Sequence, residues 1–136
     1  MSELTPVIPI ALAAWMAAEL GKVALDRNYR FGEPGGMPSG HSAVVAAAAT
    51  AIGFEAGVNS VAFGLAVVLV AIVAHDAYRV RWAIGEQGNR LNELSAVAHP
   101  KLAPLIVWRG HRVREVMAGL VLGALVAIVL ELTLFA

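Results

Sequence analysis

Long stretches without a charged residue limit the folds that this chain can adopt. Four such stretches occur, at residues 4–18, 42–54, 56–74 and 116–130. A helix that crosses a bilayer needs about 20 mostly apolar residues, within a range of about 17–25. The third stretch is long enough by itself. The first and fourth are long enough when their flanking charged residues lie near the membrane interfaces.

We therefore predict an all-α integral membrane bundle with four spans in one domain, residues 1–136. Small residues let helices approach closely, so we expect neighbours to cover the short, alanine-rich second span. No stretch shows a polar stripe at helical period, which argues against four buried helices of a soluble bundle. The predicted spans lie near residues 5–24, 40–56, 59–78 and 114–134.

The composition supports this class and excludes others. Of 136 residues, 59% are hydrophobic and 15% are charged, whereas soluble domains average about 45–50% apolar and about 25% charged residues. Ten Lys and Arg balance ten Asp and Glu, so the basic surplus of a nucleic-acid-binding protein is missing and we expect no nucleic-acid partner. The absence of cysteine excludes disulfide and thiolate chemistry.

Two long connections separate the predicted spans. Residues 26–39 are rich in Gly and Pro, which is typical of a loop. Residues 79–114 start with apolar residues at helical spacing, which predicts an amphipathic helix that lies on the membrane or caps the bundle. Pro100 and Pro104 end that helix. These two segments hold most candidate site residues, and we predict them as the active-site loops.

All ten basic residues fall on the side of the predicted bundle that carries these two loops. The positive-inside rule then makes the loops cytoplasmic and places both termini outside. We therefore expect an integral protein of a bacterial-type inner or plasma membrane.

The segment GGMPSGHS at residues 35–42 predicts an anion site. Glycines let the backbone approach a ligand closely. Ser39 and Ser42 can cap the second span, whose N-terminus presents free N–H groups and the positive end of the helix dipole. His41 adds a titratable proton donor in the first turn. The alternative is a helix-capping loop without chemistry.

His111 and Glu115 form a second signal at the start of the fourth span. Positions i and i+4 share a helix face, so the carboxylate can accept one imidazole N–H and leave the other nitrogen as a nucleophile or base. The alternative is an ordinary pair at a helix end. His41 and His111 lie at the same ends of two spans, on the basic side, and this combination suits phosphoryl transfer.

These residues resemble a known family. PSGH at 38–41 and His-x3-Glu-Val-x2-Gly at 111–119 are similar to the second and third motifs of the type 2 phosphatidic acid phosphatase superfamily, which includes the vanadium-dependent haloperoxidases. The similarity extends over about residues 20–125 and implies a helical bundle that hydrolyses lipid phosphates without a metal, through a phosphohistidine. Further residues of this sequence resemble the pattern of the superfamily's small divergent membrane branch. They are GGMPSGHSA at 35–43, Asp76, Val80-Arg81, Gly85-Glu86-Gln87 and Leu91-Asn92.

The resemblance implies a role for individual residues. His111 would be the nucleophile, Glu115 would orient it in place of the family's usual Asp, and His41 would be the general acid. The implied phosphate-binding residues are Lys22, Arg30, Ser39, Gly40 and Arg81.

The cation set departs from the family pattern. The first motif has six residues between its Lys and Arg, whereas seven separate Lys22 from Arg30. The third motif usually carries an Arg six residues before its His, and this position is Leu105. Arg81 or Arg109 would supply the missing cation, and we favour Arg81 because it belongs to the divergent pattern.

Three polar residues are candidates for a supporting role. Asp76 ends the third span, where an ionisable group is a functional candidate by default; the alternative is an ion pair with Arg79 or Arg81. Glu86 and Asn92 either line the site or form a solvated helix face. We expect neither a metal site, because the spacing of the acidic residues matches no metal motif, nor another cofactor.

Other residues within or near the spans have simpler predicted roles. Glu19 lies in the last turns of the first span, where it is expected to pair with Lys22 or with a neighbouring chain. Trp15, Trp82 and Trp108 are predicted to be membrane anchors.

The leading hypothesis is an integral-membrane lipid phosphatase that acts from the cytoplasmic face. Its substrate would be a lipid phosphomonoester or pyrophosphate, such as phosphatidylglycerophosphate, phosphatidate or a polyprenyl phosphate. The alternatives are a non-catalytic lipid-phosphate-binding protein or small transporter that retains the anion site, and a structural subunit. The bilayer and the lipid phosphate are the expected partners, and a homodimer would help to cover the short second span.

Overall fold

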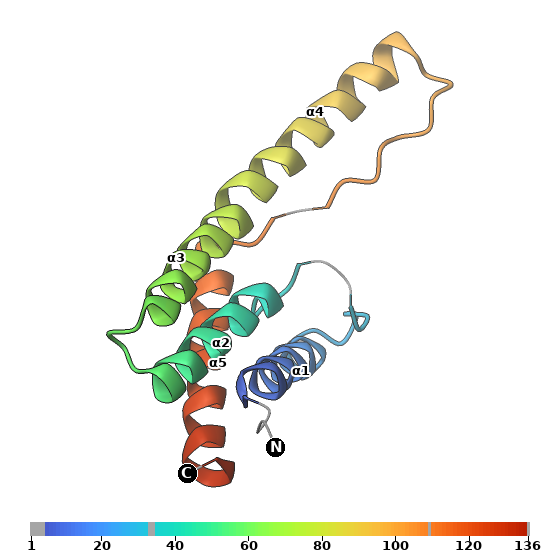
Figure 1. Cartoon of the computed structure of the whole chain (residues 1–136). Helices are drawn as coiled ribbons and strands as arrows, with labels where there is room; N and C mark the ends of the chain where they lie inside the picture. The colour runs from blue at the N-terminus through green and yellow to red at the C-terminus, as the bar shows by residue number, and fades with distance from the viewer. Residues whose placement is uncertain (1–4, 33–34, 109, 136) are drawn as a thin grey trace.

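The computed structural model describes residues 5–32, 35–108 and 110–135. Within these ranges all regular structure is helical, as predicted (Figure 1). The elements are α1 (Val7–Leu25), α2 (Gly40–Ala56), α3 (Val61–His75), the π-helical turn η1 (Asp76–Val80), α4 (Arg81–Ala98) and α5 (Val113–Leu134).

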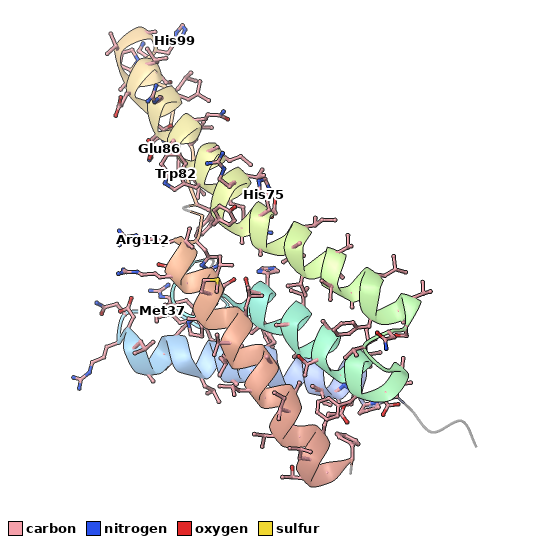
Figure 2. The ribbon with its side chains drawn as sticks, turned by 90° about the vertical axis from the view of Figure 1, so that its left-hand side faces the viewer. Met37, His75, Trp82, Glu86, His99 and Arg112 are labelled. Carbon is pink, nitrogen blue, oxygen red and sulfur yellow. The ribbon has the colours of Figure 1, made fainter. Side chains whose placement is uncertain are left out.

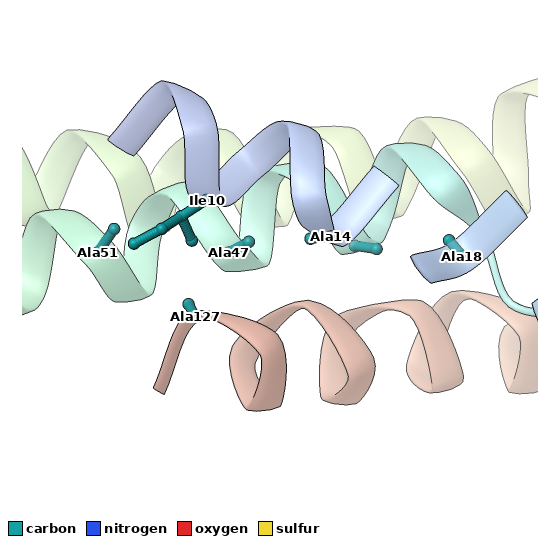
Figure 3. Close-up of a cluster of buried hydrophobic side chains, with 7 residues drawn as sticks. Ile10, Ala14, Ala18, Ala47, Ala51 and Ala127 are labelled. Atoms are coloured by element: carbon teal, nitrogen blue, oxygen red, sulfur yellow. The ribbon is translucent and has the colours of Figure 1, made fainter. Parts of the chain in front are cut away.

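Small side chains form the centre of the bundle around α2. This helix contacts α1, α3 and α5, so neighbours cover it as its alanine content predicts. Alanines recur at every fourth position of α2, which places them on one face and lets the backbones of adjacent helices approach closely. The buried cluster in Figure 3 consists of Ile10, Ala14, Ala18, Ala43, Ala47, Ala51 and Ala127.

Two glycines bring α5 into direct contact with the backbone of α2. A Cβ atom on Gly119 would overlap the carbonyl oxygen of Ser39, and one on Gly123 would overlap that of Ala43. The four-residue spacing matches the small-xxx-small pattern of closely packed membrane helices. At the same junction the Ser39 N–H donates to the carbonyl oxygen of Glu115 at 2.9 Å. The N-terminal ends of α2 and α5 are therefore held together.

The third predicted span does not end where the sequence places its end. Instead, α3, η1 and α4 form one continuous helix of 38 residues, Val61–Ala98, so much of the predicted loop 79–114 is helical and continues the span. At about 1.5 Å per residue this helix is about 57 Å long, well beyond a hydrocarbon core of about 30 Å. Figure 1 shows α4 projecting beyond the other helices, with residues 99–108 running back beside it.

We call α4 and residues 99–108 the arm. The side-chain amide of Asn92 donates to the carbonyl oxygen of Leu105 at 3.0 Å, and its oxygen accepts the Leu105 N–H at 2.7 Å. Gly88 lies against Val107, whose side chain would be 2.9 Å from a Cβ atom on that glycine. These contacts guide the returning chain towards His111 and the start of α5.

The outer surfaces of α1, α3 and α5 are mainly apolar. Within the described residues, three helices are long and apolar enough to cross a membrane, namely Val7–Leu25, Val61–Ala98 and Val113–Leu134. α3 buries none of its residues, which suits a helix that faces lipid. α2 has 17 residues and is not one of these three, so the count of four spans remains a prediction.

Candidate active site

A cavity of about 500 Å³ lies where the N-terminal ends of α2 and α5 meet α1 and the η1–α4 junction. Six of the residues predicted from sequence line it: Lys22, Gly40, His41, Asp76, Arg81 and His111. The other lining residues are Trp15, Glu19, Gly32, Gly35, Ile84 and Trp108.

His111 and Glu115 form the pair that their spacing predicts. Nδ1 of His111 lies 3.1 Å from Oε2 of Glu115, and the same oxygen accepts the backbone N–H of Arg112 at 3.1 Å. The backbone bond fixes the carboxylate at the start of α5. When Nδ1 carries the proton, Nε2 keeps a lone pair. His111 is 7% exposed and lines the cavity, which suits an oriented nucleophile.

Two backbone contacts hold the segment that carries His111 against η1 and the start of α4. Its N–H donates to the carbonyl oxygen of Ala77 at 3.1 Å. The preceding residue, Gly110, has no room for a side chain, because a Cβ atom would overlap the backbone nitrogen of Trp82 and lie 2.7 Å from the carbonyl carbon of Arg81. π-helical turns occur frequently at functional sites, and here the turn receives the segment that carries the histidine. The sequence prediction missed this role of Gly110.

His41 reaches the cavity from the first turn of α2. Ser39 caps this helix, because its Oγ accepts the Ser42 N–H at 3.4 Å and the Ser42 hydroxyl at 3.0 Å. Ser39 is fully buried and is not one of the lining residues, so its side chain belongs to the α2–α5 junction. Gly40 does line the cavity, where the positive end of the α2 dipole favours an anion.

Lys22 and Arg81 line the cavity, each paired with a carboxylate. Nζ of Lys22 lies 2.6 Å from Oε1 of Glu19, with side chains only 6% and 3% exposed. Nε of Arg81 lies 2.8 Å from Oδ2 of Asp76, with side chains 47% and 42% exposed. Both pairs agree with sequence expectations. An exposed pair contributes at most about 1 kcal/mol, so Arg81 can exchange Asp76 for a phosphate oxygen more easily than Lys22 can leave Glu19.

Several predicted residues lie away from the cavity lining. Glu86 borders a separate hollow of about 230 Å³ with Trp82 and Arg112, and Figure 2 shows Glu86 and Trp82 on the arm. Asn92 is engaged in the contact with residue 105. Arg30 is exposed and is not one of the lining residues. Arg109, the alternative to Arg81, lies outside the residues that the structure describes.

The apolar part of the cavity was not foreseen from the sequence. Trp15 and Trp108, which were predicted as membrane anchors, line the cavity together with Ile84. The Trp15 ring also packs edge-on against Phe31, with centroids 5.5 Å apart. One signal was available for Trp15: it precedes Glu19 by four residues and Lys22 by seven, so the three share a helix face.

Known proteins provide an independent comparison. A family model described as "Divergent PAP2 family" matches residues 5–126. An "Uncharacterized membrane protein YuiD" of Bacillus subtilis (strain 168) is 35% identical over 111 residues, covering 71% of this chain and 70% of that protein. No solved structure matches the chain. The relative and the three long apolar helices identify the chain as a membrane protein.

Proposed function

Because the chain belongs to the Divergent PAP2 family, we propose that it is an integral-membrane lipid phosphatase. The proposed reaction is hydrolysis of a lipid phosphomonoester or pyrophosphate, such as phosphatidylglycerophosphate or phosphatidate, through a phosphohistidine. The observation that carries this proposal is the His111–Glu115 pair, at 3.1 Å, beside a cavity that His41 and two cations also line.

In the first step Nε2 of His111 attacks phosphorus, and the bond from phosphorus to the lipid oxygen breaks. Protonated His41 gives its proton to the leaving alkoxide, which departs as the lipid alcohol. Glu115 stabilises the positive charge that develops on the His111 imidazole. In the second step neutral His41 takes a proton from water as the water attacks phosphorus, and the P–N bond breaks to release phosphate and restore His111.

The cation arrangement favours Arg81 as the residue that stabilises the equatorial oxygens. Arg81 lines the cavity and its pair with Asp76 is exposed. Leu105, at the position where the family's third motif usually has an arginine, is not one of the lining residues. A cation that turns towards developing charge lowers the barrier to phosphoryl transfer.

The apolar lining favours a substrate whose phosphate is attached to a lipid. Trp15, Ile84 and Trp108 share the cavity with the charged residues, so a phosphate and an adjoining apolar group can be accommodated together. The basic residues favour access from the cytoplasmic face.

The direct test is release of inorganic phosphate from phosphatidate or phosphatidylglycerophosphate in mixed micelles with purified protein. His111→Ala is expected to reduce release to background, and vanadate to inhibit the unmodified protein. His99→Ala is the matched control, because His99 is exposed at the far end of the arm (Figure 2). Undiminished turnover by His111→Ala would contradict the mechanism.

A second candidate function is a lipid-phosphate-binding protein without catalysis. The observation that favours it is that both cavity-lining cations are paired with carboxylates. Trapping with a ³²P-labelled lipid phosphate separates the two functions, because only the proposed enzyme gives an acid-labile, base-stable label that His111→Ala abolishes. Saturable vanadate binding without such a label would favour the binding protein.

A further inference from the structure

Glu19 is a buried carboxylate with three hydrogen-bond donors, and the proposed reaction gives it no part. Its Oε1 accepts Nζ of Lys22 at 2.6 Å. Its Oε2 accepts the Tyr29 hydroxyl and the Gly32 N–H, both at 2.9 Å. The residue is only 2% exposed. A single side chain of α1 thus holds both a cavity cation and the segment that follows this helix.

Two glycines pack the next elements against the same group. A Cβ atom on Gly40, the first residue of α2, would lie 3.5 Å from Oε1 of Glu19. A Cβ atom on Gly36 would lie 3.5 Å from Cδ of Lys22 and 3.7 Å from the Tyr29 ring, and Gly36 has a positive φ of 80° that favours glycine. Glu19 therefore lies where α1, residues 26–32 and the start of α2 meet.

The contacts leave the Lys22 ammonium little freedom. It has three N–H donors, of which one bonds to Glu19 and a second to the Tyr29 hydroxyl at 3.3 Å. Nζ also lies 5.2 Å from the centroid of the Tyr29 ring. Burial and the hydrogen bond to Glu19 raise the pKa of Tyr29, so its hydroxyl stays protonated and remains a donor. Among the described residues no third acceptor bonds to this ammonium, which leaves one N–H of Lys22 for a ligand.

We propose that Glu19 is a positioning residue, which directs the remaining Lys22 N–H towards bound phosphate and holds residues 26–32 closed against α1. The role of Glu19 in directing Lys22 towards phosphate rests on the proposed function, whereas its role in holding residues 26–32 against α1 does not. Glu19 acts through Lys22 and Tyr29 and does not itself contact the substrate.

The test compares Glu19→Gln with Glu55→Gln, the same substitution at an exposed position in the last turn of α2. The first measurement is the rate at which trypsin cleaves the folded protein after Arg27 and Arg30. Loss of hydrogen bonds to a charged group is expected to raise this rate about tenfold or more in Glu19→Gln, with no change in Glu55→Gln. Tyr29→Phe removes one hydroxyl and is expected to raise the rate less, and it serves as the test if Glu19→Gln does not fold.

The second measurement separates KM from kcat. Glu19→Gln is expected to raise KM for the lipid phosphate about tenfold and to change kcat less. Combining it with Lys22→Gln is expected to add nothing to the effect of Lys22→Gln alone, because Glu19 acts through Lys22. Independent, additive effects on KM would overturn the positioning role.

The comparison of tryptic cleavage rates tests whether Glu19 holds residues 26–32 against α1, and it does not depend on catalytic activity. Equal cleavage rates in Glu19→Gln, Tyr29→Phe and Glu55→Gln would overturn the proposal. If the unmodified protein releases no phosphate, the proposed function fails, and the vanadate dissociation constant of the same variants replaces KM in the test of Glu19.

Discussion

The bundle around α2 and the arm are held together by different kinds of contact. In the bundle, Gly119 and Gly123 place the backbones of two helices against each other. In the arm, the Asn92 amide connects α4 to the returning chain, and Figure 1 shows that α4 projects beyond the other helices. Backbone packing tolerates no added atom, whereas a segment with few buried contacts can open locally.

The two cavity histidines come from different parts of the molecule. His41 belongs to the first turn of a bundle helix, whereas His111 reaches the cavity just after the returning arm and is held there by the Ala77 carbonyl. The ion pairs follow the same division, since Glu19–Lys22 is buried at α1 and Asp76–Arg81 is exposed at the base of the arm. The buried ion pair therefore lies on the bundle side of the cavity, and the exposed pair lies at the base of the arm.

The largest expected effect comes from filling the bundle contact. Gly123→Leu places a side chain against the backbone of Ala43 and is expected to destabilise the fold by about 3 kcal/mol or more. Thermal unfolding in detergent, followed by circular dichroism, measures the change. Gly64→Leu is the control, because no atom lies within 4 Å of a Cβ atom there. Equal stability of the two variants would show that α2 and α5 are not closely packed.

A large effect on activity alone is expected from Gly110→Ala. The added methyl group would push the chain away from the backbone of Arg81 and Trp82 and displace His111. A displacement of about 1 Å can cost about 100-fold in kcat, while the unfolding temperature of the bundle should change little. Gly64→Ala is the control, because nothing outside its own helical turn lies within 4 Å of a Cβ atom there. Full phosphatase activity of Gly110→Ala would contradict backbone positioning of His111.

A smaller effect is expected when the arm is released. Asn92→Ala removes both hydrogen bonds to Leu105 and should cost about 1–3 kcal/mol of local stability. Faster tryptic cleavage after Lys101 would report the opening, with Gln87→Ala, an exposed position of α4, for comparison. Lipid-phosphate turnover is expected to fall only severalfold. If cleavage is equally fast in both variants, the Asn92 contact does not hold the arm.

The smallest expected effect on stability is that of the exposed ion pair. Asp76→Asn is expected to change the unfolding free energy by less than about 1 kcal/mol. It should also lower KM for the lipid phosphate, because Arg81 no longer has to leave a carboxylate. Thermal unfolding and steady-state kinetics on the same preparation measure both effects. An increase in KM would indicate that Asp76 orients Arg81 instead of competing for it.

Much of the fold could be predicted because it depends on local patterns. Uncharged stretches predicted the positions of α1, α2 and α5, and for α1 and α5 the stretches with their flanking residues also match the length that the bilayer sets. The His111–Glu115 contact followed from the four-residue helical repeat. The junction of α3 and α4 did not follow, because an amphipathic pattern after an apolar span is compatible with either a bend or a continuous helix.

The sequence by itself determined that this is a helical membrane protein of the Divergent PAP2 family, and it predicted an anion site at residues 35–42. Only the tertiary structure decided which residues surround the cavity, bringing in Glu19, Trp15 and Trp108 and placing Ser39 in a helix junction. The reason is physical: chain spacing sets contacts within a helix turn, but contacts between distant segments depend on how closely the backbones pack. Gly110 and Gly119 show this most clearly, because the neighbours that exclude a side chain at these positions lie far away in the sequence.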